Sequence, residues 1–230
     1  GVFFPDRAIR QAAKTFGTPF YVYDEAGLRR NTAALQTAFS WNAGFSAFFP
    51  VRWNRNRMLL RVLLESGCGA ECTSASELRD AADCGFSGEL LRYAPQRPEP
   101  EGEQLAKELD AAFVLDDPVL RPGFVPRCVI LRVHPEERLF WRGKSVAQSE
   151  KSKFGMEKRE TFWLAEYYLS QGAEVGLGMW LSENSTEVGL WPSEAQTMLM
   201  WMGEFWEKTG MRMTCCDLGA GPGIDRRGGD

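Results

Sequence analysis

The sequence predicts an α/β fold, a TIM-type (β/α) barrel with about seven strand–helix units. Short apolar segments typical of buried strands alternate with segments of helical periodicity, and one helix fits between each pair of strands. The chain has 230 residues, 44% hydrophobic and 25% charged, which is enough to bury one large core. An open doubly wound sheet is the alternative arrangement of the same units.

Seven segments are predicted as barrel strands because each is short, apolar and bounded by turn or cap residues. They lie at 45–51, 70–73, 89–94, 111–115, 128–133, 174–181 and 214–218. Helical periodicity or propensity is found at 25–39, 55–65, 75–83, 101–109, 158–171 and 194–208. The segment 117–127 contains three prolines and a glycine, so no full helix is expected there.

Cap residues indicate where several of these helices begin. Asn54 is expected to cap the helix at 55–65, and Ser193 the helix at 194–208. Ser74, followed three residues later by Glu77, predicts a capping box. Residues 16–24 are rich in β-forming side chains. We therefore divide the chain into an N-terminal β segment at 1–24 and a barrel domain at 25–230.

Composition excludes several classes of protein. The 27 basic and 31 acidic residues give a net charge of −4, so the chain lacks the basic excess that binds nucleic acid. No apolar run approaches the roughly 18–20 residues of a membrane span. The six cysteines are thinly spread, which favours a cytoplasmic protein with reduced thiols. With one histidine and no CxxC motif, no metal site is expected.

Polar chemistry is concentrated where predicted strands end. Arg52 ends the first strand, and a lysine at this position would be a candidate nucleophile. An arginine cannot replace it, because a guanidinium stays protonated. Gly219, Gly221 and Gly223 follow the last strand. Such a turn can present backbone N–H groups to a phosphate, although a simple tight turn has the same composition.

Seven segments together carry a resemblance to a known family. They are FGTPFYVYDEAGLRRN at 16–31, VRWNRN at 51–56, GCGAECTSASEL at 67–78, VLDD at 114–117, LRVHP at 131–135, SKFGM at 152–156 and DLGAGPGI at 217–224. In this order they resemble the fold-type III pyridoxal-phosphate decarboxylases, most closely the diaminopimelate decarboxylase branch. The resemblance covers nearly the whole chain.

The resemblance implies a barrel that holds pyridoxal phosphate at the carboxyl ends of its strands. The family's lysine lies in a V-K-A-N-x-N motif, and Arg52 occupies that position here. The family's H-x-H-I-G-S motif corresponds to 178–183, so the histidine that stacks on the cofactor is also missing. Trp180 could stack on a ligand or simply fill the pocket. His134, on another strand, is a weaker candidate.

Two further expectations follow from the resemblance. Lys144, Lys151 and Lys153 lie after the fifth strand, on the side where a replacement lysine would be needed. Such a lysine must be desolvated to react, which a polar loop does not favour. The resemblance also implies that the eighth barrel unit and the family's C-terminal β domain are absent. The open strand edges of such a barrel would need a cover.

The sequence therefore predicts a diaminopimelate/ornithine decarboxylase-like barrel that is catalytically inactive and has a binding or regulatory role. Pyridoxal phosphate is the cofactor that the family implies, without covalent attachment. The alternative is an amino-acid decarboxylase that binds its cofactor non-covalently through Gly219, Gly221 and Gly223. In a third hypothesis, Arg52 clamps a small anionic ligand or an amino acid. A dimer or another homo- or hetero-oligomer is expected.

Overall fold

Seven parallel strands form one curved sheet in the computed structural model, which describes residues 4–135, 139–147, 154–181, 184–219, 221 and 223. Each strand pairs with the next strand of this sheet along the chain. The strands are β1 (Phe48–Pro50), β2 (Gly69–Cys72), β3 (Leu91–Tyr93), β4 (Ala112–Leu115), β5 (Cys128–Arg132), β8 (Glu174–Gly178) and β9 (Cys215–Asp217). A doubly wound sheet would reverse its strand order at one point, so the barrel prediction is confirmed.

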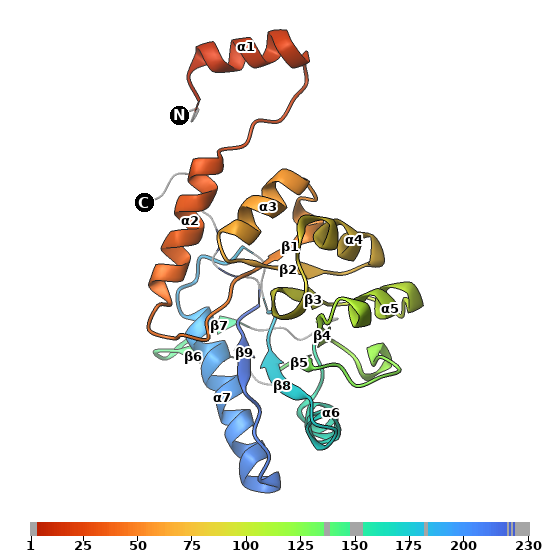
Figure 1. Ribbon diagram of the computed structural model, residues 1–230. Coiled ribbons are helices and arrows are strands. Elements are labelled where there is room, and N and C mark those ends of the chain that lie inside the picture. Colours follow the sequence, from red (N-terminus) through yellow and green to blue (C-terminus); the bar gives the residue numbers. More distant parts are fainter. Residues whose placement is uncertain are drawn as a thin grey trace.

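Six helices follow the predicted positions and pack around the sheet (Figure 1). They are α2 (Glu25–Ala38), α3 (Arg57–Glu65), α4 (Ala75–Cys84), α5 (Pro100–Glu108), α6 (Lys158–Ser170) and α7 (Leu190–Thr209). The 3-10 turns η1 (Val51–Trp53) and η2 (Gly88–Leu90) connect helices to strands, and η3 (Pro118–Leu120) lies between β4 and β5. Within the described residues, no helix combines the length and the hydropathy needed to cross a membrane.

The caps agree with the sequence in one case and differ in two. Ser74 caps α4 by accepting the Glu77 N–H, whereas the carboxylate of Glu77 accepts the N–H of Thr73, one residue before the cap, at 2.7 Å. Asn56, not Asn54, caps α3, because Asn54 uses its side chain to accept the N–H of Asn56. α7 begins at Leu190, one turn earlier than predicted, so Ser193 lies inside the helix.

Alternate residues of each strand face opposite sides of the sheet, either toward the surrounding helices or into the barrel. The residues that face the helices form the main core, and fully burying each large apolar side chain contributes about 1.5–3 kcal/mol. Leu91, Phe113 and Leu131 are examples. The opposite face, inside the barrel, has only a small apolar cluster of Ala94, Val114 and Ile130. Other positions on the inner face carry charged side chains, which form the site described below.

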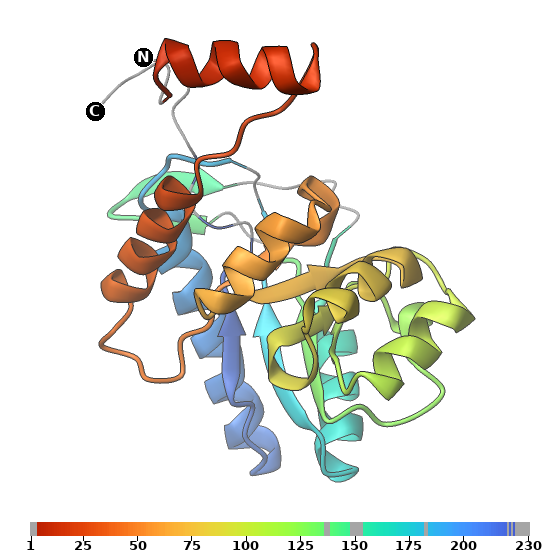
Figure 2. The ribbon, with the colours of Figure 1, turned by 45° about the horizontal axis from the view of Figure 1, so that its top comes forward.

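The N-terminal β segment expected at 1–24 is not found. Asp6–Phe16 forms a helix, α1, and residues 17–24 are extended without pairing to a strand. Figures 1 and 2 show α1 apart from the barrel, and none of its residues is buried. The alanine-rich stretch around Ile9 has high helix propensity, which outweighs the β-rich run after it. Tyr21 in that run is 89% exposed.

A β-hairpin is present where the sequence analysis expected only a polar loop. β6 (Leu139–Trp141) and β7 (Lys144–Ala147) pair antiparallel and pack against α7. Arg142 and Gly143 both have positive φ, 49° and 79°, as the tight two-residue turn of a hairpin requires. The signal was a glycine between two short β-forming runs.

Gly155 allows the segment before α6 to approach the end of β5. Its φ is +93°, and a Cβ there would lie 2.7 Å from the Val133 carbonyl carbon and 2.8 Å from the His134 nitrogen. The approach is fixed by hydrogen bonds from His134 N to Met156 O and from Met156 N to Arg132 O, both 2.9 Å. A side chain at residue 155 would therefore displace backbone, which cannot move without breaking these bonds.

We expect Gly155→Ala to lower the free energy of unfolding by about 2–4 kcal/mol, from left-handed backbone strain together with the clash. Urea denaturation monitored by circular dichroism measures it. Gly172→Ala is the matched control, since Gly172 has φ +85° but nothing within 4 Å of its Cβ position. Equal losses in the two variants would show that the close approach is unimportant.

Candidate functional site

Arg52 lies at the carboxyl end of the barrel, in η1 directly after β1. Its side chain is 30% exposed, and its Nη1 is 3.7 Å from Glu71 Oε1. The guanidinium carbon lies 4.9 Å from the ring centroid of Trp180 and 5.7 Å from that of Trp53. The predicted site residue therefore sits among two aromatic rings and one carboxylate.

Arg132, at the end of β5, is the centre of a buried ion network. Its Nη2 donates to both oxygens of Glu71 at 3.2 and 3.1 Å, and its Nη1 donates to Asp116 Oδ2 at 3.1 Å. The Arg132 side chain is only 2% exposed. Burial raises the pKa of Asp116, although the charge of Arg132 acts in the opposite direction. Glu71 is thus shared by two guanidinium groups, those of Arg132 and Arg52.

Trp180 fills the space above this network. Its ring centroid is 4.8 Å from the guanidinium carbon of Arg132, and its ring stacks on Phe154 at 5.8 Å with an interplanar angle of 24°. The residue is 8% exposed, and its Nε1 has no hydrogen-bond partner in the described structure. The sequence analysis allowed stacking on a ligand or filling of the pocket. Filling is what the geometry shows, and stacking on a ligand stays a prediction.

A second ion pair crosses the barrel interior. Arg92 of β3 donates to Asp217 Oδ2 of β9 at 3.1 Å, and its guanidinium carbon lies 3.6 Å from the ring centroid of Phe48 in β1. β1 and β9 are the two outermost strands of the described sheet. One arginine therefore contacts both edges of the open barrel.

The glycine turn after β9 is already engaged by the rest of the chain. Gly219 and Gly221 have φ of 67° and 68°, and a Cβ on Gly219 would clash with the Met179 carbonyl oxygen. Gly219 N donates to Asp217 Oδ1 at 3.0 Å, and Gly223 N donates to Ser185 O at 2.8 Å. Gly221 is the one of the three glycines with open space around its Cβ position.

The remaining predicted residues lie near the mouth or outside the described part. His134 follows β5 by two residues, and its buried Nδ1 has no partner in the described structure. Lys151 and Lys153 lie outside the described residues, as does the side chain of Lys144 in β7. The expectation that none of these lysines takes over the role of the missing amine at residue 52 is therefore not tested. Lys158, by contrast, pairs with Glu204 on α7 at 2.8 Å.

Sequence reasoning missed the inner charged residues. A signal was available in the sequence. Three otherwise apolar strands each contain a single charged residue, and a fourth strand is directly followed by one. These positions are Glu71 in β2, Arg92 in β3, Arg132 in β5 and Asp116 after β4. Side chains at alternate strand positions share a face, so such charges point into the barrel when their neighbours face the helices.

Glu194 is a buried acid beside the mouth, on the first turns of α7. It is 2% exposed, and its Oε2 has no hydrogen-bond partner among the described residues. Burial raises its pKa to about 8, the negative charge of Asp217 acts in the same direction, and a hydrogen bond from the backbone of Leu181 opposes them. This carboxyl group is therefore largely protonated at neutral pH.

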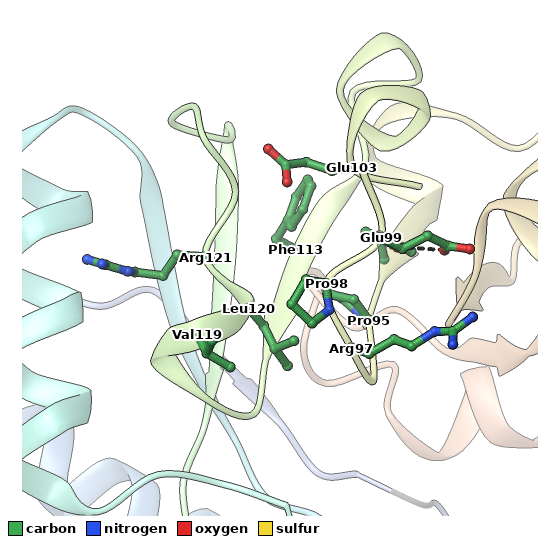
Figure 3. Close-up of a pocket in the computed structure, with 10 residues that line it drawn as sticks. Pro95, Arg97, Pro98, Glu99, Glu103, Phe113, Val119, Leu120 and Arg121 are labelled. Carbon is green, nitrogen blue, oxygen red and sulfur yellow. Dashed lines mark hydrogen bonds between the residues drawn. The ribbon is translucent and has the colours of Figure 1, made fainter. Parts of the chain in front are cut away.

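A shallow pocket is lined by residues of β3, β4 and the segments that follow them (Figure 3). Loops after β3 and β4 form it, and Tyr93 donates to Glu99 there at 3.1 Å. Arg97 and Arg121 point away from it on opposite sides. None of the residues predicted for the site lines this pocket, so it is separate from the barrel mouth.

A family model described as "Pyridoxal-dependent decarboxylase, pyridoxal binding domain" matches residues 25–230. This chain belongs to the pyridoxal-dependent decarboxylases. The family match supports pyridoxal phosphate as a possible cofactor.

Relatives agree with this assignment. Diaminopimelate decarboxylase from Methanothermobacter thermautotrophicus is 26% identical over 93% of this chain and 52% of its own length. The enzyme of the same name from Deinococcus radiodurans is 32% identical over 65% of this chain and 39% of its own. The chain thus spans about half the length, or less, of these curated decarboxylases.

Solved structures of the family share the fold. The lysine/ornithine decarboxylase of Vibrio vulnificus, complexed with putrescine, matches with a TM-score of 0.78 and 16% identity, over 95% of this chain and 57% of that chain. Diaminopimelate decarboxylase from M. jannaschii gives 0.77 and 21%, over 93% and 53%. A further match is named as a complex with pyridoxal phosphate and cadaverine. At these identities the structures establish the pyridoxal-binding barrel fold.

Glu194 makes stability depend on pH in a defined direction. The folded chain keeps a proton up to about pH 8, whereas the unfolded chain loses it near about pH 4.3. The contribution of Glu194 to the free energy of unfolding is therefore greatest below the pKa of the unfolded chain. It falls as pH rises toward the pKa of the folded chain, by at most about 1.4 kcal/mol per pH unit. Glu194→Gln should remove this fall, matching the unsubstituted protein at about pH 5 and exceeding it above about pH 8.

Urea midpoints measured across this pH range for both proteins give the difference. Glu204→Gln is the control, because Lys158 and Lys208 lower the pKa of the exposed Glu204. Its effect should not grow between about pH 5 and pH 8, where the carboxylate is already charged in both states. Parallel profiles for the unsubstituted protein and Glu194→Gln would contradict the assignment of a buried neutral acid.

Proposed function

We propose that this barrel is a catalytically inactive member of its family, with a binding or regulatory role. The observation that carries the proposal is Arg52 at the end of β1, where the resemblance expects the cofactor lysine. A guanidinium stays protonated in proteins and cannot serve as the amine nucleophile of Schiff-base chemistry. Family decarboxylation depends on that attachment, so its absence removes the shared chemistry.

The environment of Arg52 supports the same conclusion. Bound pyridoxal phosphate would supply an electron sink for loss of carbon dioxide from an amino acid. Its ring needs space at the mouth, but Trp180 fills that space and Arg132 is committed to Glu71 and Asp116. The glycine turn, where the cofactor phosphate would be expected, is also engaged. Asp217 accepts the N–H of Gly219, and its carboxylate would repel a phosphate placed there. These residues do not fit a covalently attached cofactor.

Borohydride reduction tests this proposal. After incubation with pyridoxal phosphate and reduction, we expect no stoichiometric cofactor adduct on the intact chain by mass spectrometry. Peptide mapping of any trace adduct should show scattered surface lysines. One adduct per chain at Lys144, Lys151 or Lys153 would overturn the proposal and identify a replacement lysine.

Two variants distinguish the effect of the missing amine on adduct formation from the effect of the space that Trp180 fills. Arg52→Lys alone should still give no site-specific adduct, because the indole of Trp180 remains. Arg52→Lys combined with Trp180→His should gain adduct at residue 52, because the ring space is then open. Robust labelling of Arg52→Lys alone would show that Trp180 does not block the site.

A second candidate function is binding of a small anionic ligand, such as an amino-acid carboxylate, through Arg52. It is favoured by the long 3.7 Å contact to Glu71 and by the partial exposure of the Arg52 side chain, which leave donors available. Non-covalent binding of pyridoxal phosphate through the open face of Gly221 belongs to the same candidate.

Thermal shifts with pyridoxal phosphate, inorganic phosphate and amino acids test anion binding. A ligand at about 100 times its dissociation constant stabilises the chain by about 2.7 kcal/mol, which is a shift of several degrees. Arg52→Gln should abolish the shift. Arg121→Gln, which removes an exposed arginine that also lies over a tryptophan, Trp163, should leave it intact. A shift that survives Arg52→Gln would exclude Arg52 as the clamp.

We also propose a cytoplasmic location and a homo- or hetero-oligomeric state. All six cysteines are unpaired, which suits a reducing compartment. In the described sheet, β1 and β9 each have one unpaired edge, and such edges in proteins are commonly covered by another element or chain.

A further inference from the structure

We propose that Trp180 is a built-in occupant of the barrel mouth, and that Arg52 and Arg132 form a site selective for a flat, electron-rich aromatic ring. The groups around the indole are arranged as they would be around the aromatic ring of a bound ligand. Two guanidinium carbons lie 4.9 and 4.8 Å from its centroid, and Phe154 stacks against it. This inference concerns what fills the mouth and does not depend on whether the chain has lost catalysis.

Electrostatics determine which ring fits between these groups. The face of an aromatic ring carries negative potential, and a cation over it is attracted, most strongly to indole among side-chain rings. Two cations near one ring repel each other, so the ring and Glu71 together balance them. Glu71 contacts Arg52 at 3.7 Å and Arg132 at 3.1 Å. An electron-poor ring in the same place would lose the attraction and leave the cations less balanced.

Burial strengthens this arrangement. Arg132 is 2% exposed and Trp180 8% exposed, so little water screens the contact between them. The network below the indole is also fixed, because Arg132 is held by both Glu71 and Asp116. The space that Trp180 fills is therefore defined by rigid groups and should persist when the indole is removed.

Trp180→Gly tests the proposal by emptying this space. The variant should melt several degrees lower than the unsubstituted protein, since a large buried side chain is lost. Added indole should bind the vacated space and restore most of the melting temperature, as apolar cavities take up matching ring molecules. Tetrafluoroindole has nearly the same shape but a depleted ring, and it should bind roughly tenfold more weakly.

Arg52 gives the decisive comparison. In the Trp180→Gly background, Arg52→Gln should weaken indole binding roughly 3- to 10-fold, whereas Arg52→Lys, which keeps a cation, should weaken it less. Trp201→Gly is the matched control, because Trp201 is equally buried but lies over the single, partly exposed ammonium of Lys158. Indole binding to that variant should be insensitive to residue 52.

Three results would overturn the proposal. They are equal affinity for indole and tetrafluoroindole, indole binding that is unaffected by Arg52→Gln, or no rescue of a folded Trp180→Gly protein. If Trp180→Gly does not fold, Trp180→Leu keeps part of the apolar volume, and benzene replaces indole as the probe. A folded Trp180→Leu variant whose melting temperature benzene does not raise would then refute the built-in site.

Discussion

The buried ion network around Arg132 is the constraint on which the rest of the barrel mouth depends. A guanidinium that is 2% exposed is stable only with its charge matched, because removing one partner of a buried pair costs about 3–5 kcal/mol. Glu71 and Asp116 provide that match from β2 and β4. Side chains therefore tie three strands together at their carboxyl ends, and a residue packed above them lies against the paired guanidinium of Arg132.

Arg52 and Trp180 meet that requirement together. Arg52 keeps the positive charge that a lysine would bring, so Glu71 still has a counter-ion on the side of β1. It does not keep the reactive amine. Trp180 adds an aromatic face that two cations favour. The indole thus lies beside two guanidinium groups that both contact Glu71, which explains how the fold accommodates these two side chains together.

The barrel was predictable from sequence because its signals are local. Strand runs such as that of β5, and caps such as Ser74, act over a few residues, and all seven strands were placed correctly. The site was predictable only where a motif fixed it, as for Arg52. Glu71, Arg92 and Asp217 were missed because their roles arise from pairing across the barrel. The α1 helix was missed because the β-forming residues at 16–24 indicate a strand, whereas the helix forms in the alanine-rich stretch before them.

On the inner face of the barrel, the same charged residues stabilise the fold and line the candidate site. Its apolar part is small, limited to Ala94, Val114 and Ile130, so charged pairs supply much of the order inside the barrel. Arg92 joins β3 to Asp217 of β9 and lies on Phe48 of β1, and Asp217 in turn holds the glycine turn. Charged residues at the mouth can therefore be required for stability whether or not they also take part in chemistry. In this barrel the polar side chains of the mouth are themselves part of the core, and their presence alone is no evidence of catalysis.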